Sequence, residues 1–296
     1  MESKIKQFKI SGIQPGQLLI NMPDNIKIIE TNAKHALGKS GMAELDYAFN
    51  PYLGCFHGCR YCYAIDMSPA EAANNWGKVV FVRKNIIELL EHEARTYKKG
   101  IVGISTITDP YQSVEMKYRI VPEAIGILVK NGFYVTIQTK SPLILKDIKI
   151  LEKYKKNIDV GITVTTINRK ISKILEPYAP DPFKRLNALK KLAETGIRTW
   201  LYLGPIANGV NDNIDDIDRI IEFCASTGTR IIYDSFQDFK GTVPYMAGTG
   251  YIKTGNEWWN SFRGAIEEAC RKNGVICTSE EDEWKYEAQS RFRTLF

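Results

Sequence analysis

The amino-acid sequence predicts an α/β protein built as a partial (β/α)6 barrel of the TIM type. From about residue 98 onward, short β-rich runs alternate with amphipathic helical stretches, and proline and glycine punctuate the helices. Strands separated by helices of this length form parallel βαβ units, of which about six fit. Because six is fewer than the eight units of a complete barrel, we expect an open one. In such folds the chemistry gathers at the carboxyl ends of the strands, so site residues are expected there.

The expected strands cover residues 45–54, 101–108, 133–139, 159–166, 197–203 and 229–234. Local signals place the helices between them. Asp181 and Pro182 predict an N-cap and a first turn, and Gly196 predicts the end of that helix. Ser141 and Pro142 predict a second helix start of the same kind. Further helices are expected at 85–97, 122–132, 214–228 and about 257–272.

Three regions follow from this division. Residues 45–235 form the expected barrel, residues 1–44 an N-terminal extension, and residues 236–296 a C-terminal cap.

The composition indicates an ordinary globular protein. With 44% hydrophobic and 25% charged residues, the 296-residue chain is unlike disordered, collagen-like or coiled-coil proteins. The net charge of +6 permits a nucleic-acid partner without indicating one. No apolar run approaches the roughly 20 residues of a membrane span, and the N-terminus MESKIKQFKI lacks the apolar segment of a secretory signal. We therefore expect a cytoplasmic protein with no membrane partner.

Three cysteines stand close together in NPYLGCFHGCRYCYA, where Cys55, Cys59 and Cys62 have the spacing C-x3-C-x2-C. Thiolates this close converge when a loop wraps around a shared metal centre, and iron–sulfur clusters are held in this way, usually by four cysteines. Three ligands leave one iron of a 4Fe-4S cluster open for a substrate or cofactor. Gly54 and Gly58 would relieve backbone crowding around such a cluster.

Two other interpretations of the cysteines stay open. A Cys3His zinc site would recruit His57, although structural zinc sites usually pair two separated knuckles. The thiols could also bind no metal. Cys224 and Cys270 are in phase with apolar residues of their helices and are expected in the core, and Cys277 lies in the short apolar run GVICT.

The motif, with Tyr61 before its last cysteine, resembles that of the radical SAM superfamily. The string KSGMAELDYAFNPYLGCFHGCRYCYA is similar to the branch that contains spore photoproduct lyase and its DNA repair photolyase relatives. The same holds for STITDPYQSVE (105–115), EPYAPDPFKRLNALKKLAETGI (176–197) and PIANGVND (205–212). The resemblance covers about residues 35–235.

This resemblance implies a mechanism. The open iron would chelate S-adenosylmethionine (SAM), and one electron would cleave the sulfonium bond to give methionine and a 5'-deoxyadenosyl radical, which abstracts a substrate hydrogen. A nucleic-acid or nucleotide-like substrate is expected, together with an electron donor such as a flavodoxin or ferredoxin. The alternatives are a radical SAM enzyme acting on a peptide or small metabolite and a non-enzymatic zinc or nucleic-acid binding module.

The resemblance also implies a set of SAM-binding residues at strand ends and beside the last cysteine: Tyr61, Tyr63, Ser105, Thr106, Thr108, Asp109, Lys140, Ser141, Thr163 and Thr165. The group at 105–109 closes the second strand, where the superfamily binds the methionine amino group.

Within that set, Lys140 is expected to pair with the SAM carboxylate. Ser141 has the competing role of a helix N-cap. Thr163 and Thr165 would meet the ribose or else form a buried threonine ladder. Backbone groups beside Tyr61 and Tyr63 would contact the adenine.

The chain departs from spore photoproduct lyase at one position. That enzyme is expected to use a cysteine near the end of the second strand to return a hydrogen atom to its product, and the stretch 103–106 contains none. This departure argues against dithymine repair and leaves two alternatives, a different substrate or a tyrosine such as Tyr202 or Tyr233 as the hydrogen donor.

Overall fold

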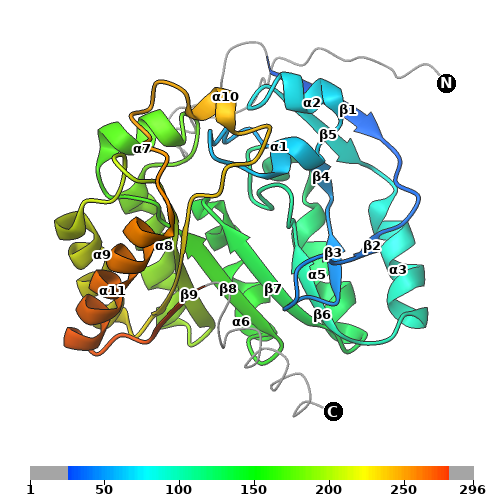
Figure 1. Ribbon diagram of the computed structural model, residues 1–296. Coiled ribbons are helices and arrows are strands. Elements are labelled where there is room, and N and C mark those ends of the chain that lie inside the picture. The colour runs from blue at the N-terminus through cyan, green and yellow to red at the C-terminus, as the bar shows by residue number, and fades with distance from the viewer. Residues whose placement is uncertain (1–25, 280–296) are drawn as a thin grey trace, which may run out of the picture.

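The computed structural model describes residues 26–279, whose strands form two sheets (Figure 1). The larger sheet has the order β11-β10-β9-β8-β7-β6-β3-β2. Its strands are β2 (Leu37–Lys39), β3 (Tyr47–Phe49), β6 (Ile101–Ile104), β7 (Tyr134–Thr139), β8 (Ile158–Thr163), β9 (Arg198–Ile206), β10 (Arg230–Ser235) and β11 (Cys277–Ser279). All neighbours pair in parallel except β2 and β3. The run from β3 to β10 supplies the six predicted parallel strands, which confirms the partial-barrel architecture.

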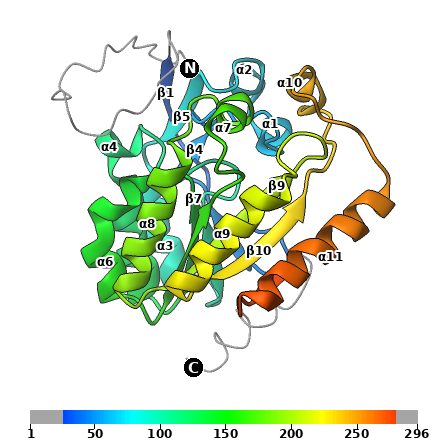
Figure 2. The same ribbon diagram turned by 90° about the vertical axis from the view of Figure 1, so that its left-hand side faces the viewer.

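The outer face of this sheet is covered by helices. Figure 2 shows three of them, α8, α9 and α11, lying side by side. The covering helices are α3 (Ile86–Thr96), α5 (Ile120–Lys130), α6 (Ile148–Lys153), α8 (Pro182–Glu194), α9 (Ile214–Thr227) and α11 (Asn256–Lys272). The predicted N-cap is confirmed, because the Asp181 carboxylate accepts the backbone N–H of Phe183 at 3.0 Å.

Shorter helices follow the strand ends and gather at one end of the molecule (Figure 1). They are α1 (Ala64–Met67), α2 (Ala70–Asn74), α7 (Arg169–Leu175) and α10 (Val243–Met246). A second sheet lies near them, with β5 (Val79–Arg83) between β1 (Lys27–Thr31) and β4 (Tyr52–Leu53). This sheet was not expected from the sequence, because its strands are short and pair across long sequence separations.

The two flanking regions contribute strands as well as covering segments. Residues 26–44 of the predicted extension supply β1 and β2, and the predicted cap supplies α10, α11 and β11, which extends the large sheet beside β10. The rest of both regions lies outside the described residues. Cys224 and Cys270 are buried in the core as expected. Within residues 26–279, no helix is long and apolar enough to cross a bilayer.

A buried carboxylate joins the second sheet to the helical layer. Glu115 of α4 (Glu115–Tyr118) accepts the backbone N–H of Val121 at 3.0 Å, at the start of α5, and the hydroxyl of Tyr52 in β4. Burial raises the pKa of Glu115 to about 7, although both hydrogen bonds favour the ionised form. The contact holds β4 in place, and β4 directly precedes the loop that carries Cys55, Cys59 and Cys62, called the cysteine loop below.

We predict that Glu115 makes stability depend on pH. A carboxyl whose pKa rises from 4.5 to about 7 on folding stabilises the fold fully below pH 4.5 and loses this contribution as the pH rises through 7. Relative to wild type, Glu115→Gln should therefore gain up to about 3 kcal/mol in the free energy of unfolding between pH 5 and pH 8. Urea unfolding followed by circular dichroism measures this difference.

The matched control is Glu91→Gln, at an exposed position of α3. Its difference from wild type should be the same at both pH values. A pH-independent difference for Glu115→Gln would contradict the prediction.

Candidate functional site

A single cavity inside the barrel collects most of the predicted site residues. Those that line it are Cys55, Cys59, Cys62, Tyr63, Ser105, Thr106, Thr108, Asp109, Lys140, Thr163 and Tyr202. They come from the cysteine loop, from β8 and β9, and from the turns that follow β6 and β7. The carboxyl ends of the parallel strands thus converge on the cysteine motif, as expected for this architecture.

The cysteine loop runs from β4 to α1, and its path depends on glycine. Gly54 has φ of +80° and Gly58 has φ of +61°, conformations that residues with a side chain rarely adopt. A Cβ atom at position 54 would collide with the carbonyl oxygen of Val79, and one at position 58 would lie 3.0 Å from the ring of Tyr178. The predicted role of both glycines in relieving crowding is therefore consistent with the structure.

Two side chains from neighbouring segments clamp this loop. Gln112 accepts the backbone N–H of Phe56 at 2.9 Å and donates to the carbonyl of Gly54 at 3.2 Å. The indole N–H of Trp76 donates to the carbonyl of Cys59 at 3.0 Å. The backbone of the cysteine loop is therefore held at several points along its length.

The thiols are suited to a metal centre. Cys55 and Cys59 are buried, and burial raises the pKa of Cys59 to about 11 and that of Cys62 to about 12. A bound cation supplies the positive charge that such thiolates need, and thiolates are the soft ligands that iron–sulfur clusters use. Among residues 26–279, no three His, Cys, Asp or Glu side chains meet closely enough to hold a single metal ion.

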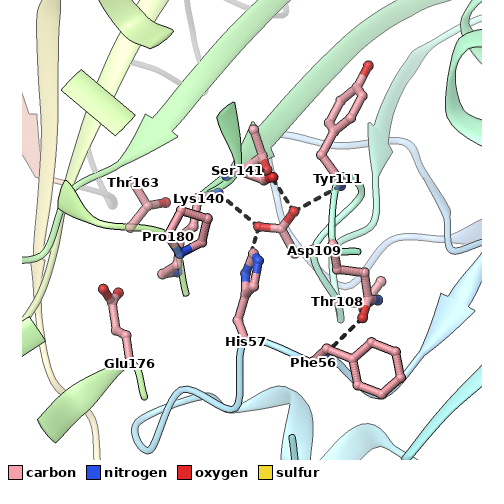
Figure 3. A network of polar contacts seen from close by, with 12 residues as sticks. Phe56, His57, Thr108, Asp109, Tyr111, Lys140, Ser141, Thr163, Glu176 and Pro180 are labelled. Carbon is pink, nitrogen blue, oxygen red and sulfur yellow. Dashed lines mark hydrogen bonds and ion pairs between the residues drawn. The ribbon is translucent and has the colours of Figure 1, made fainter. Parts of the chain in front are cut away.

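The imidazole of His57 is paired with a buried carboxylate. Its Nδ1 lies 3.3 Å from Oδ2 of Asp109 and forms a buried ion pair with it (Figure 3). Burial alone would lower the pKa of His57, but Asp109 and, to a smaller extent, Cys55 raise it to about 9.

Asp109 uses both carboxylate oxygens inside the protein. Oδ1 accepts the Thr139 hydroxyl at 2.7 Å and the Tyr111 N–H at 2.9 Å, and Oδ2 accepts the Lys140 N–H at 2.8 Å (Figure 3). Burial would raise the pKa of Asp109, yet His57 and these donors hold it at about 2. Asp109 therefore ties the cysteine loop to the end of β7 and has no oxygen left for a cofactor.

A second buried carboxylate supports the loop from the other side. Glu176 forms an ion pair with Arg185, with 2.6 Å between Oε2 and Nη2, and both side chains are at most 1% exposed. Oε1 of Glu176 accepts the hydroxyls of Tyr61 and Thr165. Burial would raise the pKa of Glu176, but Arg185 and Lys140 hold it at about 2.

Lys140 brings a positive charge to the cavity. Among the described residues it is the only lysine or arginine that lines it. Its Nζ lies 5.5 Å from the centre of the Tyr61 ring, a cation–π contact. Burial would lower the pKa of Lys140, but Cys59 and Glu176 raise it, so the ammonium form is retained.

Several predicted residues have other contacts. Ser141 caps the helical turn Pro142–Asp147, whose Leu143 N–H donates to its hydroxyl at 3.2 Å, which confirms the N-cap interpretation. Thr165 lies beyond the end of β8, outside the cavity, and donates to Glu176 at 2.7 Å. Its expected contact with the ribose is therefore not supported.

The prediction that Tyr233 could be the hydrogen donor is wrong. In the register of the sheet Ile232 pairs with Tyr202, so Tyr233 points to the opposite face. There its hydroxyl donates to Glu267 of α11 at 2.5 Å. This placement removes Tyr233 from the expected hydrogen donors, whereas Tyr202 lies at the cavity.

Some residues of the site were not predicted. Gln112 and Glu176 fell within segments noted only for their resemblance. Arg185 did leave a signal, because it lies four residues before Leu189 and so on the apolar face of α8. Gln138 and Trp200, which also line the cavity, gave none.

Comparison with known proteins identifies the family. The model of the radical SAM superfamily matches residues 49–224, which include the cysteine loop and the strands up to β9. The chain belongs to the radical SAM superfamily. This superfamily consists of enzymes, and SAM and an iron–sulfur cluster are therefore the expected cofactors. The soft thiolate groups of Cys55, Cys59 and Cys62 are ligands of the kind that such a cluster uses.

Two sequence relatives of this radical SAM protein are themselves named only as uncharacterized proteins. One from Methanocaldococcus jannaschii is 31% identical over 200 residues, covering 68% of this chain and 74% of the relative. One from Mycobacterium tuberculosis is 27% identical over 218 residues, covering 69% of this chain and 63% of the relative.

Solved structures share the fold. Spore photoproduct lyase in complex with dinucleoside spore photoproduct aligns with a TM-score of 0.66 at 12% identity, over 86% of this chain and 81% of that chain. SuiB of Streptococcus suis bound to S-adenosylmethionine aligns with a TM-score of 0.58 at 14% identity, over 81% and 51% of the two chains.

We predict that Arg185→Met destabilises the protein by about 3–5 kcal/mol, because it leaves the Glu176 carboxylate buried without its partner. The double variant Glu176→Gln/Arg185→Met should recover part of this loss. Denaturant unfolding measures both changes.

Lys84→Met is the control, since it removes one partner of the exposed pair with Glu30. It should change stability by less than about 1 kcal/mol. An equal loss in the free energy of unfolding for Arg185→Met and Lys84→Met would contradict the prediction that removing one partner of the buried pair costs more than removing one partner of the exposed pair.

Proposed function

We propose that this radical SAM enzyme holds a 4Fe-4S cluster through Cys55, Cys59 and Cys62 and acts on a nucleic-acid or nucleotide-like substrate. The main observation is that the three cysteines and the predicted strand-end residues line one cavity. The fold shared with spore photoproduct lyase, whose structure contains a dinucleoside ligand, supports the substrate class. When bound, the cluster and SAM supply a 5'-deoxyadenosyl radical that removes a hydrogen atom from the substrate.

The residues of the cavity have separate proposed roles. Lys140 pairs its ammonium group with the SAM carboxylate, for which its retained charge is suited. Ser105 and Thr106, which follow β6, bind the methionine amino group, and Thr163 offers its hydroxyl to the ribose. The backbone beside Tyr61 and Tyr63 contacts the adenine.

Other residues are proposed to position the cysteine loop and the residues of the cavity. Asp109 and Thr108 position the cysteine loop, since the Thr108 hydroxyl donates to the carbonyl of Gly54 at 2.6 Å. Glu176 holds Tyr61, on whose ring the Lys140 ammonium rests.

The hydrogen donor is proposed to be Tyr202. Position 103, near the end of the second barrel strand, is a glycine, and a Cβ atom there would lie 2.5 Å from Cδ1 of Leu45, so a cysteine at this position would require the Leu45 side chain to move. Tyr202 instead presents its ring to the cavity from β9. A flavodoxin or ferredoxin is the proposed electron donor, and the cytoplasm the proposed location.

The first test is SAM cleavage by anaerobically reconstituted protein with dithionite. We expect 5'-deoxyadenosine release by wild type and by Cys224→Ala, a core substitution outside the cavity, and none by Cys59→Ala, which loses a cluster ligand. Adding deuterated DNA or RNA should transfer deuterium into 5'-deoxyadenosine.

A colourless protein with stoichiometric zinc would contradict the cluster. Release of 5'-deoxyadenosine that gains no deuterium from either nucleic acid would contradict the substrate class and leave the radical chemistry intact.

A second prediction concerns Lys140. Lys140→Met should weaken SAM binding about 10- to 100-fold, because it removes a charge-assisted hydrogen bond to the carboxylate. Equilibrium dialysis with radiolabelled SAM measures the dissociation constant. Lys146→Met, at an exposed position six residues later, is the matched control and should bind as wild type does. Unchanged affinity in Lys140→Met would remove this residue from the SAM site.

A further inference from the structure

The cavity has a second part whose residues the proposed SAM site does not use. It includes Gln138, the last but one residue of β7, and Trp200 of β9, which both line the cavity. Central strands of a parallel sheet are normally covered on both faces, yet the Gln138 side chain is exposed. An exposed amide inside a barrel is positioned to contact whatever enters.

The orientation of the Gln138 amide is fixed by its neighbour. Its Nε2 donates to the hydroxyl of Thr163 at 3.0 Å. This bond leaves the second N–H of the amide and its Oε1 for a ligand. A donor and an acceptor then lie side by side in one plane, the arrangement that pairs with the edge of a nucleobase.

Trp200 provides a flat surface beside this amide. Its indole N–H donates to Oδ1 of Asp159 at 2.9 Å, and the same oxygen accepts the Thr136 hydroxyl at 2.6 Å. A Cβ atom at Gly161 would lie almost equally close to three neighbouring atoms of the six-membered ring, so one face of the indole rests on this glycine. Trp200 also lines the cavity, where it packs beside Ile232 and Tyr202.

The charges of this part of the cavity favour a neutral group over a phosphate. Apart from Lys140 near the cysteines, the described residues that line the cavity include no lysine or arginine, whereas Asp159 and Glu44 bring negative charge. A neutral planar group is admitted, and a phosphate attached to it would stay nearer Lys140 or outside.

We propose that Gln138 and Trp200 form a nucleobase subsite, in which Gln138 hydrogen-bonds the edge of a base and the Trp200 indole contacts its face. This inference rests on the proposed function and adds the orientation of the substrate, with the base inside the barrel and the phosphate directed outward. The nearby Thr163 then serves both sites, because its hydroxyl orients the Gln138 amide.

The test uses the holoenzyme, reconstituted with cluster and SAM, and measures dissociation constants by calorimetry. The probes are a thymidine dinucleotide, an adenosine dinucleotide and an abasic dinucleotide of the same length. Wild type should bind both base-bearing probes at least about 10-fold more tightly than the abasic one. Gln138→Met, which keeps length without the amide, should reduce that preference about 3- to 10-fold. Trp200→Leu should reduce it about 5- to 100-fold.

Trp258→Leu is the matched control, because Trp258 stacks on Phe262 in α11, away from the cavity, and it should keep the wild-type preference. Equal affinity of wild type for base-bearing and abasic probes would overturn the subsite, as would an unchanged preference in both cavity variants. Release of 5'-deoxyadenosine by wild type is measured in parallel. If wild type releases no 5'-deoxyadenosine, the result counts against the proposed function. If wild type releases 5'-deoxyadenosine but shows no preference for base-bearing probes, the result counts against the subsite alone.

Discussion

The arrangement of the site depends on a buried ion pair that is hydrogen-bonded in several directions. Arg185 of α8 pairs with Glu176 and also donates to the carbonyls of Pro180 and Thr163, at 2.7 and 3.3 Å. Glu176 in turn accepts the hydroxyl of Tyr61 from the cysteine loop. Burying two charges is costly, and the cost is offset only when the geometry is good and the remaining polar atoms are paired. The pair therefore connects the cysteine loop, the end of β8 and the start of α8 in one geometry.

Asp109 has the corresponding place on the other side of the loop. Its ion pair with His57 and its hydrogen bond to the Lys140 N–H join the cysteine loop to the end of β7. The cysteine loop thus lies between two buried carboxylates that are each ion-paired and hydrogen-bonded, and polar networks of this kind favour one conformation because losing a partner inside the protein is costly. This explains how a loop with glycines at two positions keeps its thiols in place without regular structure.

Local signals in the sequence predicted much of this fold, and long-range contacts account for what was missed. The six barrel strands were predicted from the alternation of β-rich runs with amphipathic helical stretches. The N-cap at Asp181 was predicted from the proline that follows it. Both signals lie within short stretches of the sequence. Tyr202 and Tyr233 illustrate the limit, since both are strand tyrosines and only the register between β9 and β10 decides which one faces inward. The ion pair between Glu176 and Arg185 likewise depends on a tertiary contact, the packing of α8 beside the segment that contains Glu176.

The close contact between Gly103 and Leu45 has a consequence for how the barrel can vary. Leu45 lies just before the first barrel strand and fills the space that a side chain at position 103 on the second strand would need. The two positions share one volume, so a larger residue at one requires a smaller residue at the other. We expect related chains with a side chain at the position of Gly103 to have a short residue at the position of Leu45, as a compensating pair of exchanges.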